Sequence, residues 1–200
     1  MTALLDILKD RVLLCDGGFG SRVQAADLDV ERDFWGKENC TDILTRSRPD
    51  LVRDIHASYF EAGADMGITN TFGASPVTLG EFDLADEAYG LNQEAAFLAR
   101  EAAGRFAADG RPRFVLGDVG PGTKLPSLGH IDYDRLEAAL TVQCSGLIAG
   151  EVDAILIETC QDPLQIKAAV NGAKAARLKA KVDLPIFVQV TVETTGTLLV

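Results

Sequence analysis

The protein has 200 residues, 47% hydrophobic and 24% charged, which are the proportions of a globular protein with a buried core. Its formal net charge of −11 disfavours a nucleic-acid backbone or an anionic membrane as a partner. The N-terminus does not read as a signal peptide, and no apolar run approaches the ~18 residues that cross a bilayer. We therefore expect a cytoplasmic protein with no nucleic-acid partner, no membrane partner and four reduced cysteines.

The chain alternates short strand-like runs with longer amphipathic stretches. A short first helix is expected over residues 3–8. Strands are predicted at residues 12–15, 65–69, 113–117, 153–157 and 185–192. The helices between them are predicted at residues 49–62, 86–108 and 133–148, with a further one after Pro163.

The helix over 49–62 has the clearest local signals. Ser47 suits the position before the first helical turn, where a hydroxyl caps free backbone N–H groups. Leu51, Ile55 and Tyr59 recur every four residues, so they are the expected buried face.

Repeated strand–helix units predict an α/β fold in which parallel strands are joined by right-handed crossovers. The segments DMGITNT (65–71) and DAILIET (153–159) share one layout, which is a weak internal repeat. A closed (β/α)₈ barrel needs eight strands and about 250 residues, whereas only five strands are predicted here. The pattern alone allows an open doubly wound sheet or part of a barrel, in one domain over residues 1–200.

Polar residues follow the first four predicted strands. In parallel α/β folds ligands bind beyond the carboxyl ends of the strands, so these residues are expected to share one rim. Carboxylates there would pair with the ammonium group of an amino acid, and glycine N–H groups would hold its carboxylate. The rim residues are Asp16, Gly17 and Gly18, then Asn70 and Thr71, then Asp118, and finally Glu158.

Each of these residues also has a purely structural interpretation. Asp16-Gly17 is a common turn dipeptide, Asn70 and Thr71 could cap the following segment, and Asp118 could begin a turn. The glycines after Asp16 lack the third glycine of a dinucleotide-binding motif. Glu158 is the hardest to explain structurally, because an acid after a buried strand is costly unless it is paired.

The histidines and cysteines point less clearly to chemistry. His56 falls on a helix and His130 in a glycine-rich loop, so both are weak candidates for a catalytic base. Cys15 and Cys160 flank strand ends, but two thiols without a third ligand are poor evidence for a metal site. No catalytic residue and no metal ligand is therefore assigned within the chain.

Four blocks of sequence carry a resemblance to a known family. They are VLLCDGGFGS, ENCTDILTRSRPDLVRDIHASYFEAGADMGITNTFGAS, VLGDVGPGTKLP and DAILIETCQDPLQIKAA. From about Leu13 onward the chain resembles the homocysteine S-methyltransferase family, and most strongly its cobalamin-dependent branch. The resemblance implies methyl transfer to the sulfur of homocysteine, which gives methionine. It also implies a (β/α)₈ TIM barrel that is incomplete here, with about the first five βα units present.

The resemblance also implies roles for individual residues. Asp16 and Glu158 would hold the homocysteine ammonium group, Gly17 and Gly18 would hold its carboxylate, and Asn70 and Thr71 would line the pocket. In the family a zinc ion held by three cysteines binds the homocysteine thiolate. Those cysteines lie in N-C and G-G-C-C motifs that this chain lacks, so zinc ligands are expected outside it. Methylcobalamin would sit on another domain.

The expected protein is thus the amino-acid-binding half of a methyltransferase site, inactive by itself. Its expected partners are homocysteine and cobalamin- and folate-binding domains of the same or another chain. Two alternatives remain open. One is a betaine- or S-methylmethionine-dependent homocysteine methyltransferase, and the other is a non-catalytic half-barrel that completes its sheet with a second chain.

Overall fold

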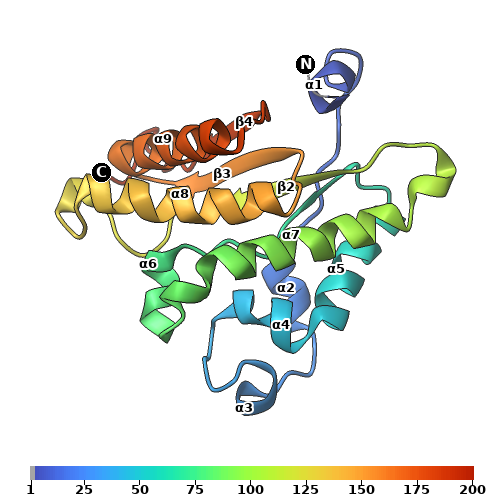
Figure 1. Ribbon diagram of the computed structural model, residues 1–200, viewed down its shortest axis with the longest axis horizontal. Coiled ribbons are helices and arrows are strands. Elements are labelled where there is room, and N and C mark those ends of the chain that lie inside the picture. The colour runs from blue at the N-terminus through green and yellow to red at the C-terminus, as the bar shows by residue number, and fades with distance from the viewer. Residues whose placement is uncertain (1–2) are drawn as a thin grey trace.

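The structure, a computed structural model, describes residues 3–200 apart from the side chain of Ala107. Its centre is a sheet of four parallel strands, each hydrogen-bonded to the next in chain order (Figure 1). The order of the described strands does not reverse, as it would in a doubly wound sheet. The strands are β1 (Met66–Ile68), β2 (Phe114–Val119), β3 (Ala154–Cys160) and β4 (Ile186–Val190).

Three long helices connect these strands, as the alternating pattern predicted. They are α7 (Ala88–Gly104), α8 (Tyr133–Ala149) and α9 (Pro163–Ala180), and α8 and α9 lie side by side along the sheet (Figure 1). No helix within residues 3–200 is long and apolar enough to cross a bilayer. The other α-helices are α1 (Ala3–Ile7), α2 (Phe19–Gln24), α3 (Val30–Asp33), α4 (Leu44–Ser47), α5 (Pro49–Glu61) and α6 (Pro76–Leu79).

The first predicted strand, residues 12–15, is much shorter than expected. Only Cys15 forms a bridge, to Met66 of β1, and the bridge is parallel. The backbone N–H of Met66 donates to the carbonyl of Leu14 at 3.0 Å, and that of Asp16 donates to the carbonyl of Met66 at 2.8 Å. This segment therefore lies beside β1 without forming a full strand.

Helix α5 begins at Pro49 as predicted, but two details of the prediction are wrong. Ser47 does not cap α5; it ends α4, and its hydroxyl donates to the carbonyl of Ile43 at 3.2 Å. The buried face is also rotated by one residue, because the helix packs its Phe60 ring against Gly67 of β1. The buried residues of α5 are Val52, Ile55, His56 and Phe60, whereas Leu51 and Tyr59 are half-buried.

Apolar layers cover both faces of the sheet. On one face, Val115 and Ile155 pack against α8 and α9 residues such as Leu147 and Ala169. On the other face, Leu4 of α1 is fully buried in a cluster with strand residues. The strands are thus sandwiched near their amino ends, which holds their carboxyl ends in place.

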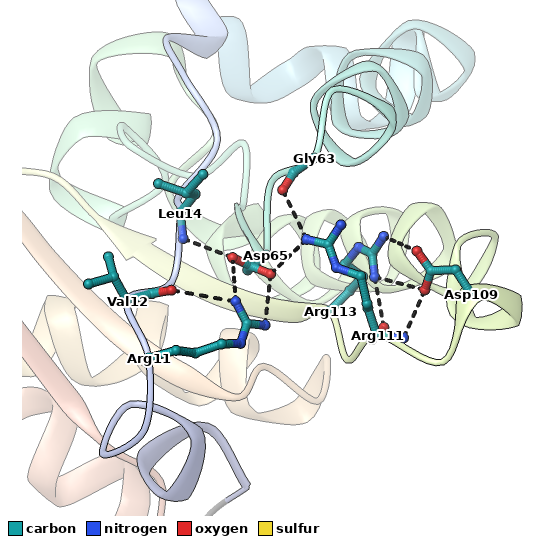
Figure 2. Close-up of polar contacts among 8 residues, drawn as sticks. All are labelled: Arg11, Val12, Leu14, Gly63, Asp65, Asp109, Arg111 and Arg113. Atoms are coloured by element: carbon teal, nitrogen blue, oxygen red, sulfur yellow. Dashed lines mark hydrogen bonds and ion pairs between the residues drawn. The ribbon is translucent and has the colours of Figure 1, made fainter.

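An ion-pair cluster ties the amino end of the sheet together (Figure 2). The buried carboxylate of Asp65, just before β1, accepts hydrogen bonds from Arg11 at 3.0 and 3.1 Å and from Arg111 at 3.1 Å. It also accepts one from the backbone N–H of Leu14 at 3.1 Å. Mainly through the hydrogen bonds from Arg11, the pKa of Asp65 falls to about 2. One carboxylate thereby joins three separate segments.

Candidate functional site

The carboxyl ends of the strands surround a cavity of about 440 Å³. All six residues predicted to bind substrate line it, although they come from segments as far apart as residues 16 and 158. Those six are Asp16, Gly17, Gly18, Asn70, Thr71 and Glu158. The predicted convergence on one rim is therefore observed, while the role of each residue in binding stays a prediction.

Asp16 is held in place by β1. One carboxylate oxygen, Oδ2, accepts a hydrogen bond from the backbone N–H of Ile68 at 2.9 Å. The other, Oδ1, is buried and receives no hydrogen bond from the described residues. Burial, with the nearby charge of Glu158 in addition, raises the pKa of Asp16 to about 7. This carboxyl group is thus rigidly placed and still has a free acceptor.

The two glycines after Asp16 present backbone to the cavity. A Cβ on Gly17 would lie 3.0 Å from the ring of Tyr59, so a larger residue would push that ring away. The Tyr59 hydroxyl donates to the carbonyl of Gly18 at 3.1 Å, which fixes the loop. Bare backbone of this kind lets a ligand approach closely. Tyr59 was expected only as a core residue, and its helix spacing gave no hint of this contact.

Asn70 and Thr71 tie neighbouring loops together and do not cap a helix. The Asn70 amide donates to the carbonyl of Thr41 at 2.9 Å, and the Thr71 hydroxyl donates to the carbonyl of Asp118 at 2.8 Å. The next helix, α6, is capped instead by Ser75, whose hydroxyl accepts from the N–H of Thr78. These bonds lock the ends of β1 and β2 into one wall of the cavity.

Glu158 reaches the cavity through an irregularity in β3. The pairing of β3 with β4 shifts register between Ile157 and Cys160. Between them Thr159 has a φ of 57°, a left-handed conformation that is strained for a β-branched residue. Such bulges turn a side chain away from the regular alternation of a strand. The Thr159 hydroxyl also donates to Glu158 Oε2 at 3.0 Å, so the bulge both aims and holds this carboxylate.

Asp118 is a further acid of the site, which was expected at the same rim but was not assigned to substrate binding. It lies inside β2 rather than in a turn, it is only 4% exposed, and it lines the cavity. Burial, together with Glu158, raises its pKa well above the ordinary value. Its place after a buried strand was visible in the sequence, but the following Gly-Pro suggested a turn and concealed its role.

Neither histidine lines the cavity. His56 is fully buried, and neither ring nitrogen has a hydrogen-bond partner among the described residues. Burial lowers its pKa to about 4, so the ring is neutral at physiological pH. It packs near the ring of Phe19, with centroids 5.4 Å apart. His130 Nδ1 accepts a hydrogen bond from the N–H of Leu125, which is a loop contact.

The cysteines do not form a metal site. All four are free thiols, and Cys15 is exposed whereas the other three are buried. Burial raises the pKa of Cys40 to about 11 and those of Cys144 and Cys160 to about 12, which disfavours the thiolate form that zinc binds. Among residues 3–200 no group of three or more histidine, cysteine or acidic side chains is arranged to hold a metal ion.

The site therefore combines acids without a cation. Asp16, Asp118 and Glu158 all line the cavity, and no lysine or arginine within the described residues does. Unpaired carboxyl groups beside bare backbone suit a ligand with one positive and one negative group, and charge-assisted hydrogen bonds would hold both.

Comparison with known proteins shows similarity to one protein family. The homocysteine S-methyltransferase family model matches residues 13–200. The chain is 50% identical over 198 residues to methionine synthase of Mycobacterium tuberculosis and 48% identical to that of Mycobacterium leprae. In both cases the match covers 99% of this chain but only 16% of the relative.

The fold also matches solved structures. The homocysteine methyltransferase MmuM from Escherichia coli superposes with a TM-score of 0.78 in its oxidised form and 0.77 in its metallated form, both at 20% identity. The match covers 98% of this chain in each case, and 68% and 70% of the respective MmuM chains. The family model spans nearly the whole chain, and the chain therefore belongs to the homocysteine S-methyltransferase family.

Proposed function

We propose that the protein takes part in methyl transfer to the sulfur of homocysteine, which forms methionine, and that this chain supplies the amino-acid-binding half of the site. The observation that carries the proposal is the convergence of Asp16, Glu158 and the glycine backbone on one cavity that lacks a cationic side chain. The similarity to two methionine synthases supports the same reaction.

In this proposal different groups of the cavity bind the two charged groups of the amino acid. Asp16 and Glu158 accept hydrogen bonds from the α-ammonium group, and backbone around Gly17 and Gly18 receives the α-carboxylate. Asn70 and Thr71 line the same cavity. With the α-amino and α-carboxylate groups held, the thiol-bearing side chain is the part of homocysteine that stays free to react.

The zinc that the family implies does not fit the cysteines of this chain, which are dispersed and mostly buried. We propose that the zinc ligands lie outside these 200 residues and that methylcobalamin binds on another domain. A zinc titration of the purified protein tests the first point. We expect no tight stoichiometric zinc binding, and a tight site that disappears when these four cysteines are replaced would contradict the proposal.

We further propose that residues 1–200 are the N-terminal part of a (β/α)₈ barrel. The consecutive strand order is that of a barrel wall. Strand β4 is an edge of the described sheet, and its Val188 and Val190 are 43% and 48% exposed. An exposed apolar edge of this kind requires a neighbour, because its unpaired backbone groups invite pairing with another strand. Further strands, from the same or another chain, would supply it.

The methyl donor is proposed from sequence similarity alone. The 50% identity to a methionine synthase favours the cobalamin-dependent branch, with cobalamin- and folate-binding domains as partners, over a betaine- or S-methylmethionine-dependent enzyme. The cavity itself does not distinguish these donors, because its residues are assigned to the amino acid.

A comparison of two ligands tests the proposed function. L-homocysteine and 4-mercaptobutanoic acid differ only by the amino group, so calorimetric titration of the intact protein isolates the contribution of the acids. We expect the ligand without the amino group to bind about tenfold more weakly or worse, since it leaves two carboxyl groups unpaired. Equal affinity for both ligands, or no binding of either, would contradict the proposal.

A further inference from the structure

Asp118 and Glu158 form an acid pair within the cavity. Asp118 lies on β2 and Glu158 on the neighbouring β3, and both line the cavity. In the pairing of β2 with β3, Asp118 lies opposite Leu156, two residues before Glu158, and a hydrogen bond to Glu158 is among the causes that raise the pKa of Asp118. Asp118 Oδ1 is buried and receives no hydrogen bond from the described residues, so this nearly inaccessible side chain has an unused acceptor atom.

Within residues 3–200, the charged groups that act on the Asp118 carboxyl group are all acidic. Its backbone N–H donates to Thr69 Oγ1 at 2.9 Å, and its carbonyl accepts from Thr71 and Gln143, so neighbouring side chains bind its backbone. The titratable groups that act on the carboxyl group itself are Glu158 of β3, Asp16 beside β1 and Asp42 of the turn over Thr41–Ile43, and the nearby Cys160 is a neutral thiol whose pKa Asp118 helps to raise. All are acidic groups or a thiol, so a proton is the available counter-charge.

Two carboxyl groups that share a hydrogen bond need one proton between them, because a carboxylate can only accept. The environments of the two groups differ. Asp118 is almost completely buried, whereas Glu158 is only half-buried and accepts a hydrogen bond from Thr159. Desolvation disfavours the charged form more strongly at the more buried group. The proton therefore belongs on Asp118, the more buried of the two.

We propose that Asp118 is a positioning residue that stays protonated at neutral pH and donates a hydrogen bond to Glu158. This bond, with the one from Thr159, fixes the Glu158 carboxylate in the orientation that meets an ammonium group. It also keeps the charge of the site low, since three carboxylates around one ammonium group would repel each other. The part that concerns the ammonium group rests on the proposed function, whereas the protonation of Asp118 does not.

Carbon-13 NMR of the protein with labelled aspartate side chains tests the protonation without any ligand. The Asp118 carboxyl signal is identified by its absence in Asp118→Asn. We expect this signal to have the chemical shift of a protonated acid at pH 7 and to move in Glu158→Gln, which changes the hydrogen-bond partner. An ionised Asp118 at pH 7 would overturn the inference.

Homocysteine affinity in two variants tests the positioning role. Asp118→Ala removes the donor and should weaken binding about tenfold or more, because Glu158 loses a charge-assisted hydrogen bond. Asp118→Asn supplies an amide donor of similar shape and should restore most of that loss. If Asp118→Asn instead weakens binding as much as Glu158→Gln does, Asp118 carries a charge that meets the ligand directly and the inference is wrong.

The pH profile adds a signature that a merely structural role would not produce. As pH rises and Asp118 ionises, the wild-type protein should lose affinity relative to Asp118→Asn, which cannot ionise. A constant affinity ratio over the range in which the NMR signal titrates would count against the inference. If the wild-type protein binds no homocysteine although Asp118 is protonated, the proposed function is wrong. The inference that Asp118 is protonated at neutral pH is then still correct.

Discussion

The two ends of the parallel sheet use the same residue types in opposite ways. At the amino end the Asp65 carboxylate lies between Arg11 and Arg111 and has a pKa of about 2 (Figure 2). At the carboxyl end Asp16 has no cationic partner among the described residues, and its pKa is about 7. Burial does not explain the difference, since Asp65 is only 2% exposed.

The contrast separates stability from binding. At the amino end the Asp65 carboxylate is paired within the chain, and its charge holds segments together. At the carboxyl end unpaired acids cost stability, and in the proposed function the ammonium group of the ligand would pair with them. This division is common in α/β barrels, in which the carboxyl end of the strands carries the chemistry and the amino end carries stability.

Asp65→Asn should have the largest effect, on stability. It removes a buried charge shared by Arg11 and Arg111 and leaves both guanidinium groups without their partner, which costs about 2–3 kcal/mol. Urea denaturation measures this loss. Asp6→Asn is the matched control, because its ion pair with Lys9 is exposed to solvent and contributes little to stability. Equal losses of stability in Asp65→Asn and Asp6→Asn would show that the buried Asp65 ion pairs do not stabilise the fold more than an exposed pair does.

The pH dependence of Asp65 follows from its lowered pKa. The folded state binds a proton less readily than the unfolded state, so the stabilisation is complete above about pH 4, near the unfolded pKa. It is lost as pH falls toward about 2. Asp65→Asn should therefore differ most from the wild-type protein at neutral pH and least near pH 2.

Asp16→Asn and Glu158→Gln should each weaken homocysteine binding about tenfold, which is about 1.4 kcal/mol, because each removes one charge-assisted partner of the ammonium group. Calorimetric titration of the intact protein gives the affinities. Asp54→Asn and Glu61→Gln, at exposed positions of α5, are the matched controls and should leave affinity unchanged. Unchanged affinity in both site variants would rule out the proposed ammonium site.

Asp16→Asn should act on stability in the direction opposite to Asp65→Asn. The raised pKa means that the folded state retains a proton that the unfolded state releases, so the contribution of Asp16 is greatest below about pH 4. It declines as pH rises to about 7. At pH 8 the amide should therefore stabilise the protein by about 1 kcal/mol relative to the aspartate. A loss of stability at pH 8 would show that Asp16 is paired after all.

Thr159→Val should have the smallest effect. It keeps the β-branched shape and removes the hydroxyl that donates to Glu158, so homocysteine affinity should fall about threefold, or about 0.6 kcal/mol. Thr159→Ser keeps the hydroxyl and should bind like the wild-type protein. If the two variants behave alike, the bulge rather than the hydroxyl positions Glu158.

Much of this architecture could be predicted from the sequence because it depends on local pattern. Short apolar runs bounded by polar residues predicted β1 to β4, and longer amphipathic stretches predicted α5, α7, α8 and α9. The direction of the chain predicted the site, because residues that follow parallel strands lie at the same end of the sheet. Asp16, Asn70 and Glu158 could therefore be placed together before any coordinates were known.

Other features depend on contacts between distant segments, which a local pattern does not contain. The buried face of α5 differs from the predicted one because Phe60 packs on β1. Ser47 does not cap α5 because it is the last residue of α4. The strained Thr159 follows from the register shift against β4. The ionisation of the acids also depends on contacts between distant segments. Sequence determined which positions carry carboxyl groups, but only the tertiary structure put arginines beside Asp65 and another acid beside Asp118.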